Sequence, residues 1–297
     1  MSTPDEERYV VRHGAGAAGP YDLEVTPRSA GWAHSGLRVL HLPAGGTHTV
    51  ATGDDEVVVL SLGGAATVHV DGRSYTLEGR SGVFDGPSDV VYAPRDAELR
   101  IDSEEGGRFA LCAARCERRL EPAYLPKDAV PVELRGAGRA SRQVNNFGIP
   151  GVLEADRLIA CEVLTPGGNW SSWPPHKHDE ERDGETRLEE IYYFEVADGP
   201  AGAGFGVQRV YGHEGAPIDV TTEVRTGDVV LIPHGWHGPS MAAPGYDLYY
   251  LNVMAGPGTE RAWLICDDPA HAWVRDTWAD QAVDERLPLH VREAGHR

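Results

Sequence analysis

The segment DVVYAP, residues 89–94, recurs in the second half of the chain as DVVLIP, residues 228–233. Each copy follows a longer β-rich run, EVVVLSLGG from Glu56 and EIYYFEV from Glu190. The turns before these runs also match, with LPAGGTH from Leu42 and TPGGNW from Thr165. Short β-branched and aromatic runs separated by Gly, Pro and Asp are typical of antiparallel barrels and sandwiches. The repeat therefore predicts an all-β chain with two jelly-roll barrels joined by short helical or irregular connections.

A proline-rich segment separates the two copies and begins EPAYLPKDAVP at Glu121. We place the boundary within it, so that residues 1–135 form the first barrel and residues 136–297 form the second. The C-terminal segment RAWLICDDPAHAWVRDTW, from Arg261, is too aromatic for a disordered tail. We therefore expect it to pack back on the barrels.

Composition excludes several classes of function. The 297 residues carry a net charge of −19, which argues against nucleic acid or an anionic membrane as partner. No apolar run approaches the roughly 20 residues of a membrane span. The start MSTPDEERYV is polar and charged, unlike a signal peptide, and predicts a cytoplasmic protein. The four cysteines form no paired CxxC motif, so we interpret them as reduced and mostly buried.

The segment PPHKHDEERDGETRLEEIYYFE, residues 174–195, holds the candidate metal ligands. Residues i and i+2 of a strand point to the same face, so His176 and His178 can enter one barrel interior together. Glu190 opens the next aromatic strand, and His237 or His234 in PHGWH can add a further imidazole. Three histidines and a carboxylate suit Zn, Mn, Fe, Co or Ni. The pattern predicts one divalent transition metal per chain.

The first half offers an internal comparison. Its matching stretch, GGTHTVATGDDEVVVL, keeps Glu56 and His48 but has no HxH pair. Its later turn, YAPRDAEL, contains no histidine. We therefore expect the first barrel to bind no metal of this kind and to serve as a structural or substrate-shaping partner.

The Gly-rich turn, HxH, Glu, Gly-Asp, Pro-x-Gly and final His together resemble the cupin pattern. Two spacings differ: the gap from His178 to Glu190 is long, and His237 follows its Gly after one residue. These differences leave Glu189 and His234 as alternative ligands. Over whole segments (PPHKHD, LEEIYYFE, GFGVQRVYG, the run from Asp228 and DDPAHAWVRDTW) the chain resembles one bicupin family. That family contains 5-deoxy-glucuronate isomerase of myo-inositol catabolism and 4-deoxy-L-threo-5-hexosulose-uronate ketol-isomerase.

The resemblance implies an aldose–ketose isomerase that converts 5-deoxy-D-glucuronate to 5-dehydro-2-deoxy-D-gluconate. Carried over position by position, it implies the metal ligands His176, His178, Glu190 and His237, with Zn or Mn expected ahead of Fe, Co and Ni. Such an isomerase needs either a base that moves a proton or a hydride shift. Tyr192 and His234 are the candidate catalytic groups, with Glu189 ranked below them. A uronate also needs a cation for its carboxylate, and Arg142 and Arg209 are preferred over Lys177.

Two other classes of function remain open on the residues alone. The same ligand set can hold Fe(II) in an oxygenase, which would consume oxygen, or can sit in a sugar-binding cupin without turnover. The expected partner is a small sugar acid, with no nucleic acid and no membrane. Exposed strand edges of the barrels favour a homo-oligomer.

Overall fold

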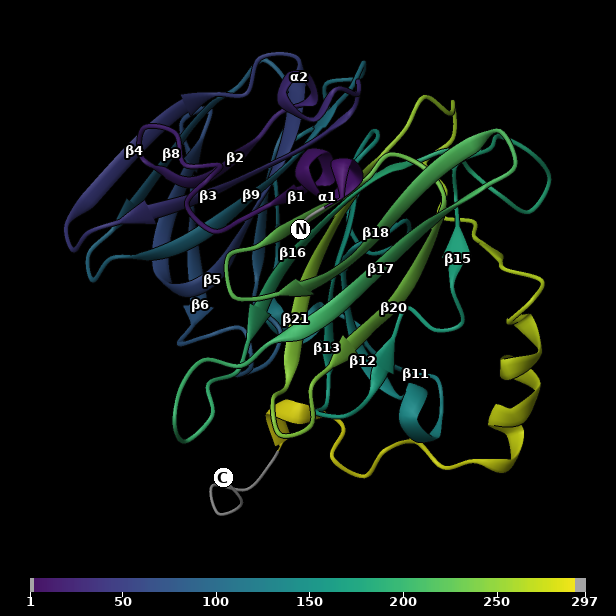
Figure 1. Cartoon of the computed structure of the whole chain (residues 1–297). Coiled ribbons are helices and arrows are strands. Elements are labelled where there is room, and N and C mark those ends of the chain that lie inside the picture. The colour runs from purple at the N-terminus through teal and green to yellow at the C-terminus, as the bar shows by residue number, and fades with distance from the viewer. Residues whose placement is uncertain (1–2, 292–297) are drawn as a thin grey trace.

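The computed structural model describes residues 3–291 and shows an all-β chain, as predicted. Figure 1 shows one β-rich half in purple and blue beside a second half in teal, green and yellow. The helical elements are short and lie at the periphery. They are α1 (Pro4–Tyr9), α2 (Pro27–Ala30), η1 (Lys127–Ala129), η2 (Gly138–Ala140), η3 (Ala272–Asp280) and η4 (Leu289–Val291). None of the helices within residues 3–291 is long and apolar enough to cross a membrane.

The first half consists of antiparallel strands in the order β10-β7-β5-β9-β3-β2, with β6 and β8 paired to β5 and β4 paired to β8. The strands are β2 (Tyr21–Val25), β3 (Ser35–Leu42), β4 (Gly46–Ala51), β5 (Asp55–Val70), β6 (Arg73–Arg80), β7 (Val90–Ala93), β8 (Glu98–Ser103), β9 (Gly107–Arg115) and β10 (Ala123–Leu125). The long strand β5 bends at Gly64, where φ is +103° and a Cβ would lie 2.6 Å from the carbonyl oxygen of Gly106. Glycine is therefore required where β5 passes from one sheet to the other.

The second half has two sheets, ordered β1-β19-β16-β21-β13-β12-β11 and β18-β17-β20-β15-β22, with β14 paired to β20. The strands are β1 (Val10–Val11), β11 (Val132–Arg135), β12 (Arg142–Gly148), β13 (Ile159–Thr165), β14 (Trp170–Ser171), β15 (His176–Lys177), β16 (Glu189–Val196), β17 (Gly206–His213), β18 (Ala216–Val224), β19 (Val229–Ile232), β20 (Trp236–Ala242), β21 (Leu248–Ala255) and β22 (Cys266–Asp267).

The strand order of the two halves confirms the duplication. The series β7-β5-β9-β3-β2 has its counterpart in β19-β16-β21-β13-β12, and the matching DVVYAP and DVVLIP segments supply β7 and β19. Two strands from residues 1–135 lie in a sheet of the second half. β1 pairs with β19, and β11 pairs with β12. The division after residue 135 stays a prediction.

Two carboxylates cross between the halves in a reciprocal way. Glu56, at the start of β5, accepts hydrogen bonds from the backbone N–H groups of residues 156–158, just before β13. Glu189, at the start of β16, accepts from the backbone N–H groups of residues 33–35, where β3 begins. Glu56 is therefore the counterpart of Glu189, and Val57 is the counterpart of Glu190. The sequence alone suggests that Glu56 matches the candidate ligand Glu190, and the structure moves this match by one residue. A shift of one residue places the side chain on the opposite face of the strand.

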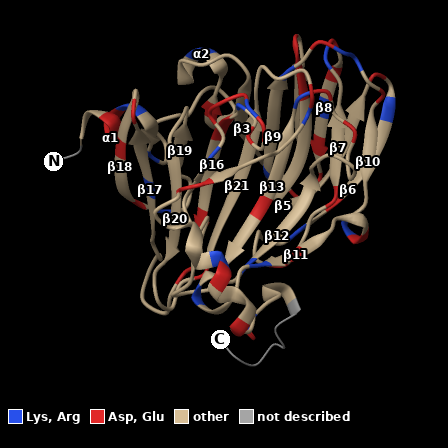
Figure 2. Cartoon of the chain, turned by 90° about the vertical axis from the view of Figure 1, so that its right-hand side faces the viewer, with Lys and Arg blue, Asp and Glu red and all other residues tan. Residues whose placement is uncertain are grey.

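The core follows from strand alternation. An apolar cluster that includes Leu40, Val57, Val68 and Phe109 fills the first barrel. Many of the charged residues lie in loops and near strand ends, and most of the ribbon between them is uncharged (Figure 2). All four cysteines are free, and three of them are buried, as expected. The C-terminal segment packs back as predicted, through β22 on β15 and through buried Leu287 and Leu289.

Candidate metal centre

The predicted ligands meet inside the second barrel. His176 lies on β15 directly opposite His237 on β20, and His178 follows β15. Glu190 comes from β16 of the facing sheet. All four side chains are buried, with His237 fully inaccessible. The closure of two sheets into a barrel thus brings residues from both sheets to one point.

Three of these residues form a tight group. Glu190 Oε2 lies 3.0 Å from His178 Nε2 and 3.1 Å from His237 Nε2. The candidate donor atoms of His178, Glu190 and His237 all lie within 4.8 Å of one another, so this triad could hold a metal ion. The ring of His176 lies 4.4 Å from that of His237, centroid to centroid, which leaves it beside the triad.

Backbone carbonyls orient the three imidazoles. Nδ1 of His176 contacts Pro174 O at 3.4 Å, Nδ1 of His178 contacts Leu188 O at 3.2 Å, and Nδ1 of His237 contacts Gly235 O at 3.2 Å. A carbonyl accepts only from an N–H, so each ring carries its proton on Nδ1 when neutral. The Nε2 lone pairs are then available to a metal, the usual arrangement for ligating histidines.

One buried nitrogen of this group has no hydrogen-bond partner in the part of the chain that the structure describes, as expected of a metal ligand. His237 Nε2 makes no hydrogen bond within the described residues although it is fully buried. Burial would raise the pKa of Glu190, but the adjacent His178 and His237 favour its ionised form more strongly and lower the pKa to about 2. Burial and the two neighbouring imidazoles lower the pKa of His176 well below its usual value. One carboxylate beside three buried imidazoles is a donor set that suits a divalent transition metal, so the residues fit.

The two alternative ligands lie elsewhere. Glu189 points to the start of β3 through the hydrogen bonds described above. His234 is half-buried, and its Nε2 contacts Pro217 O at 3.3 Å. Neither side chain belongs to the triad.

A hydroxyl cluster lies beside the triad. The ring of Tyr192 lies 6.0 Å from that of His237. Ser172 Oγ lies 3.1 Å from the hydroxyl of Tyr192 and 3.0 Å from that of Tyr250, and all three residues are buried. Burial and the Glu190 charge raise the pKa of Tyr192 well above its usual value, so its phenol is neutral at neutral pH. Ser172 and Tyr250 were not predicted from the sequence, because a serine in a loop and a second strand tyrosine carry no spacing signal.

The two candidate arginines differ sharply. Arg142 is buried, and its Nη1 donates to the carbonyls of Ala140 at 3.1 Å and Trp173 at 3.4 Å. No carboxylate within residues 3–291 forms an ion pair with it, and burial lowers the pKa of Arg142 to about 10. Arg209 is half-buried on β17 and stacks on Tyr211, with 4.0 Å from Cζ to the ring centroid. The alternation of β17, with Gln208 and Val210 buried, turns Arg209 away from the barrel interior.

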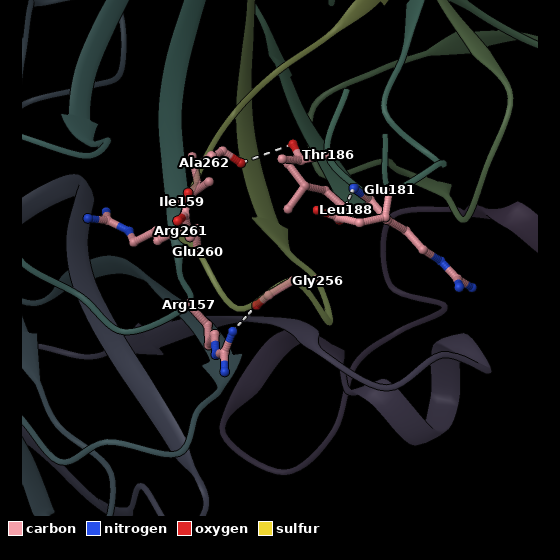
Figure 3. A pocket seen from close by; sticks show the side chains of 11 residues that line it. Arg157, Ile159, Glu181, Thr186, Leu188, Gly256, Glu260, Arg261 and Ala262 are labelled. Carbon is pink, nitrogen blue, oxygen red and sulfur yellow. Dashed lines mark hydrogen bonds between the residues drawn. The ribbon is translucent and has the colours of Figure 1, made fainter. Parts of the chain in front are cut away.

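A small cavity lies outside the triad, between the loop that follows His178 and the chain after β21 (Figure 3). Its lining includes Arg157, Glu181, Leu188 and Arg261. Its volume of about 10 Å³ is near the minimum for a single water molecule. It is therefore too small for a sugar acid.

Two β-barrels in one chain, with a buried histidine–glutamate triad in the second, define the class as a bicupin. The chain belongs to the KduI/IolB family, whose model matches residues 9–274.

Similar proteins support this assignment over nearly the whole chain. The 5-deoxy-glucuronate isomerase of Geobacillus thermodenitrificans is 40% identical over 278 residues, covering 93% of this chain and 94% of the relative. That of Bacillus subtilis (strain 168) is 36% identical over 254 residues, covering 84% and 91%.

Solved structures show the same fold. The crystal structure of an IolB-like protein from Salmonella typhimurium LT2 superposes with a TM-score of 0.82 at 34% identity, covering 90% of this chain and 98% of that one. The oxalate decarboxylase of Lactobacillus farciminis, in a formate complex, has a TM-score of 0.62 at 13% identity, covering 87% and 88%. The second likeness shows the fold alone.

Proposed function

We propose that this chain is a metal-dependent 5-deoxy-glucuronate isomerase that converts 5-deoxy-D-glucuronate to 5-dehydro-2-deoxy-D-gluconate in myo-inositol catabolism. The observation that carries the proposal is the buried triad His178, Glu190 and His237 in a chain 40% identical to such an isomerase over 93% of its length. His176 would complete the ligand set for one divalent transition metal per chain, Zn or Mn ahead of Fe, Co and Ni.

A metal held there supplies a Lewis acid for the carbonyl and neighbouring hydroxyl of the sugar. The chain's own residues supply position and protons. The phenol of Tyr192, hydrogen-bonded to Ser172, would donate to a sugar oxygen and would not act as a base, because its pKa is raised. Arg142 has no carboxylate in an ion pair within residues 3–291, and a guanidinium left in this state suits the uronate end of the substrate. His234 and Arg209 stay predictions, with side chains directed away from the triad.

Elemental analysis beside an anaerobic assay with 5-deoxy-glucuronate tests the proposal. We expect about one transition metal per chain and turnover without oxygen. The double variant His176→Ala/His178→Ala should lose both metal and activity. Metal without anaerobic turnover would instead support an oxygenase or a sugar-binding cupin, and oxygen consumption with Fe(II) separates those two.

We also propose a homo-oligomer that pairs through β11. This strand ends its sheet, and its Val132 and Leu134 are exposed at 39% and 38%. Exposed apolar edge strands need cover, and a second copy of the chain is the simplest partner. Light scattering on the wild type and on Val132→Glu/Leu134→Glu tests this: an unchanged mass would refute it. Cell fractionation tests the cytoplasmic location expected from the sequence.

A further inference from the structure

The long segment between His178 and Glu190 is folded around a buried lysine. Residues Arg182 and Glu185 pair through two backbone hydrogen bonds of 3.1 Å, which close a tight loop. The loop returns Glu185 to the interior, where its carboxylate lies 2.7 Å from Lys177 Nζ. Lys177 thus forms an ion pair with the loop that separates the proposed ligands His178 and Glu190.

Lys177 is surrounded by acids. Its Nζ also lies 2.6 Å from Asp179 and 3.1 Å from Glu180. The side chains of Lys177 and Glu185 are only 4% and 1% exposed. A charge so deeply buried is stable only when it is paired and hydrogen-bonded, so this cluster fixes the chain on both sides of Lys177. Those neighbours are His176 and His178.

Asp179 connects the two ligand-bearing segments. One carboxylate oxygen, Oδ1, binds Lys177, and Oδ2 accepts a 2.7 Å hydrogen bond from the backbone N–H of Gly235. The carbonyl of that same Gly235 orients the ring of His237. Oδ2 also lies 2.8 Å from Nε2 of His213 on β17. A single carboxylate therefore links the His176–His178 segment to the turn that aims His237.

The outer side of the loop is held by the chain after β21. Thr186 Oγ1 donates to Ala262 O at 3.0 Å, as Figure 3 shows, and Thr186 N donates to Leu264 O at 3.2 Å. Leu188 N donates to His178 O at 2.8 Å, and Leu188 O accepts from the ring of His178. The loop is thus fixed both at the ligands and at its far edge.

We propose that Asp179 is a positioning residue for the metal centre, which sets the affinity and coordination geometry of the bound metal by holding His178 and His237 in register. It touches neither substrate nor reacting atoms. This inference rests on the proposed function, because it presupposes that the triad binds metal. The long loop, folded by Glu185 around Lys177, is the device that keeps Asp179 in place.

The test compares Asp179→Asn with Asp228→Asn. Asp228 is a matched control, because its side chain is also 6% exposed, forms one arginine ion pair and accepts backbone N–H groups, yet it contacts no ligand segment. Zinc affinity is measured by chelator competition, and the Co(II)-loaded proteins are compared by visible absorption. We expect Asp179→Asn to weaken zinc binding about 10- to 100-fold and to shift the Co(II) bands. Asp228→Asn should leave both readouts at the wild-type level.

The outcomes separate the two proposals. If the wild type binds no zinc, the proposed function fails. If the wild type binds zinc and Asp179→Asn matches it in affinity and spectrum, the positioning role alone is refuted. His213→Leu provides a milder variant. The side chain of His213 is 22% exposed, and the substitution removes one partner of Asp179. A folded His213→Leu protein should bind zinc a few-fold more weakly than the wild type. If Asp179→Asn fails to fold, wild-type zinc affinity in His213→Leu would refute the positioning role of Asp179.

Discussion

Arg142 and Arg80 are both buried arginines, and the structure gives them opposite surroundings. Arg80 forms an ion pair with Glu162 across the two halves, and the two side chains are 4% and 1% exposed. Within the described chain Arg142 donates hydrogen bonds to carbonyl oxygens and lies over the ring of Trp278, and it has no carboxylate in an ion pair. Replacing each with methionine, which is similar in length and uncharged, should therefore separate a structural arginine from a substrate-binding one.

The expected stabilities follow from these contacts. Burial lowers the pKa of Arg142 from 12.5 to about 10, which corresponds to about 3 kcal/mol of penalty for holding its charge. Arg142→Met relieves that penalty and loses hydrogen bonds of similar total worth. We expect its free energy of unfolding to change by less than about 1.5 kcal/mol. Arg80→Met leaves Glu162 as a buried unpaired charge and should lower the free energy of unfolding by about 3–5 kcal/mol.

The expected activities are reversed. Two charge-assisted hydrogen bonds from Arg142 to a uronate carboxylate are worth at least about 3 kcal/mol, or roughly a hundredfold in kcat/KM. Arg142→Met should show that loss, mainly in KM, with metal content unchanged. Urea denaturation and steady-state kinetics measure the two effects. Wild-type kcat/KM in Arg142→Met, or a loss of stability as large as that of Arg80→Met, would refute the assignment.

Three further outcomes are expected. Glu190→Gln removes the only carboxylate of the triad and should lower metal affinity at least about 100-fold, measured by chelator competition; unchanged affinity would mean that the triad is not the site. Hydrogen bonds from Arg286 lower the pKa of Asp284 despite its burial, so its contribution to stability is present above pH 3.8 and is lost as the pH falls below it. Asp284→Asn should flatten that acid limb in pH-dependent denaturation, and an unchanged slope would contradict this. Gly64→Ala should destabilise the protein by about 1–3 kcal/mol in thermal unfolding, because the strand bends there with a positive φ; an unchanged midpoint would show that the bend relaxes.

The features that could be predicted from the sequence are those that depend on the spacing of nearby residues. The DVVYAP and DVVLIP segments predicted equivalent strands because each is short, apolar and ended by proline. The HxH pair predicted two imidazoles entering one barrel from a single segment. The choice between Glu189 and Glu190 stayed open because adjacent strand residues face opposite ways, and only the register with β19 and β21 settles which one points inward.

Other features depend on contacts that no spacing encodes. Arg142 and Arg209 are equally plausible in the sequence, but only Arg142 is buried in the structure. Asp179 follows an HxH pair like many loop aspartates, and its bond to Gly235 joins residues 56 positions apart. Ser172 and Tyr250 meet across 78 positions. Such pairs form only once both sheets are closed.

The reciprocal carboxylates Glu56 and Glu189 make the folding of the two barrels interdependent. Each carboxylate caps the start of a strand in the opposite barrel, through three backbone N–H groups. A barrel separated from its twin would expose those three donors and leave its own glutamate without them. Each barrel therefore depends on the other for these hydrogen bonds, whether or not it carries a metal site of its own. A split protein, cut in the linker and co-expressed, should reassemble through the same exchange.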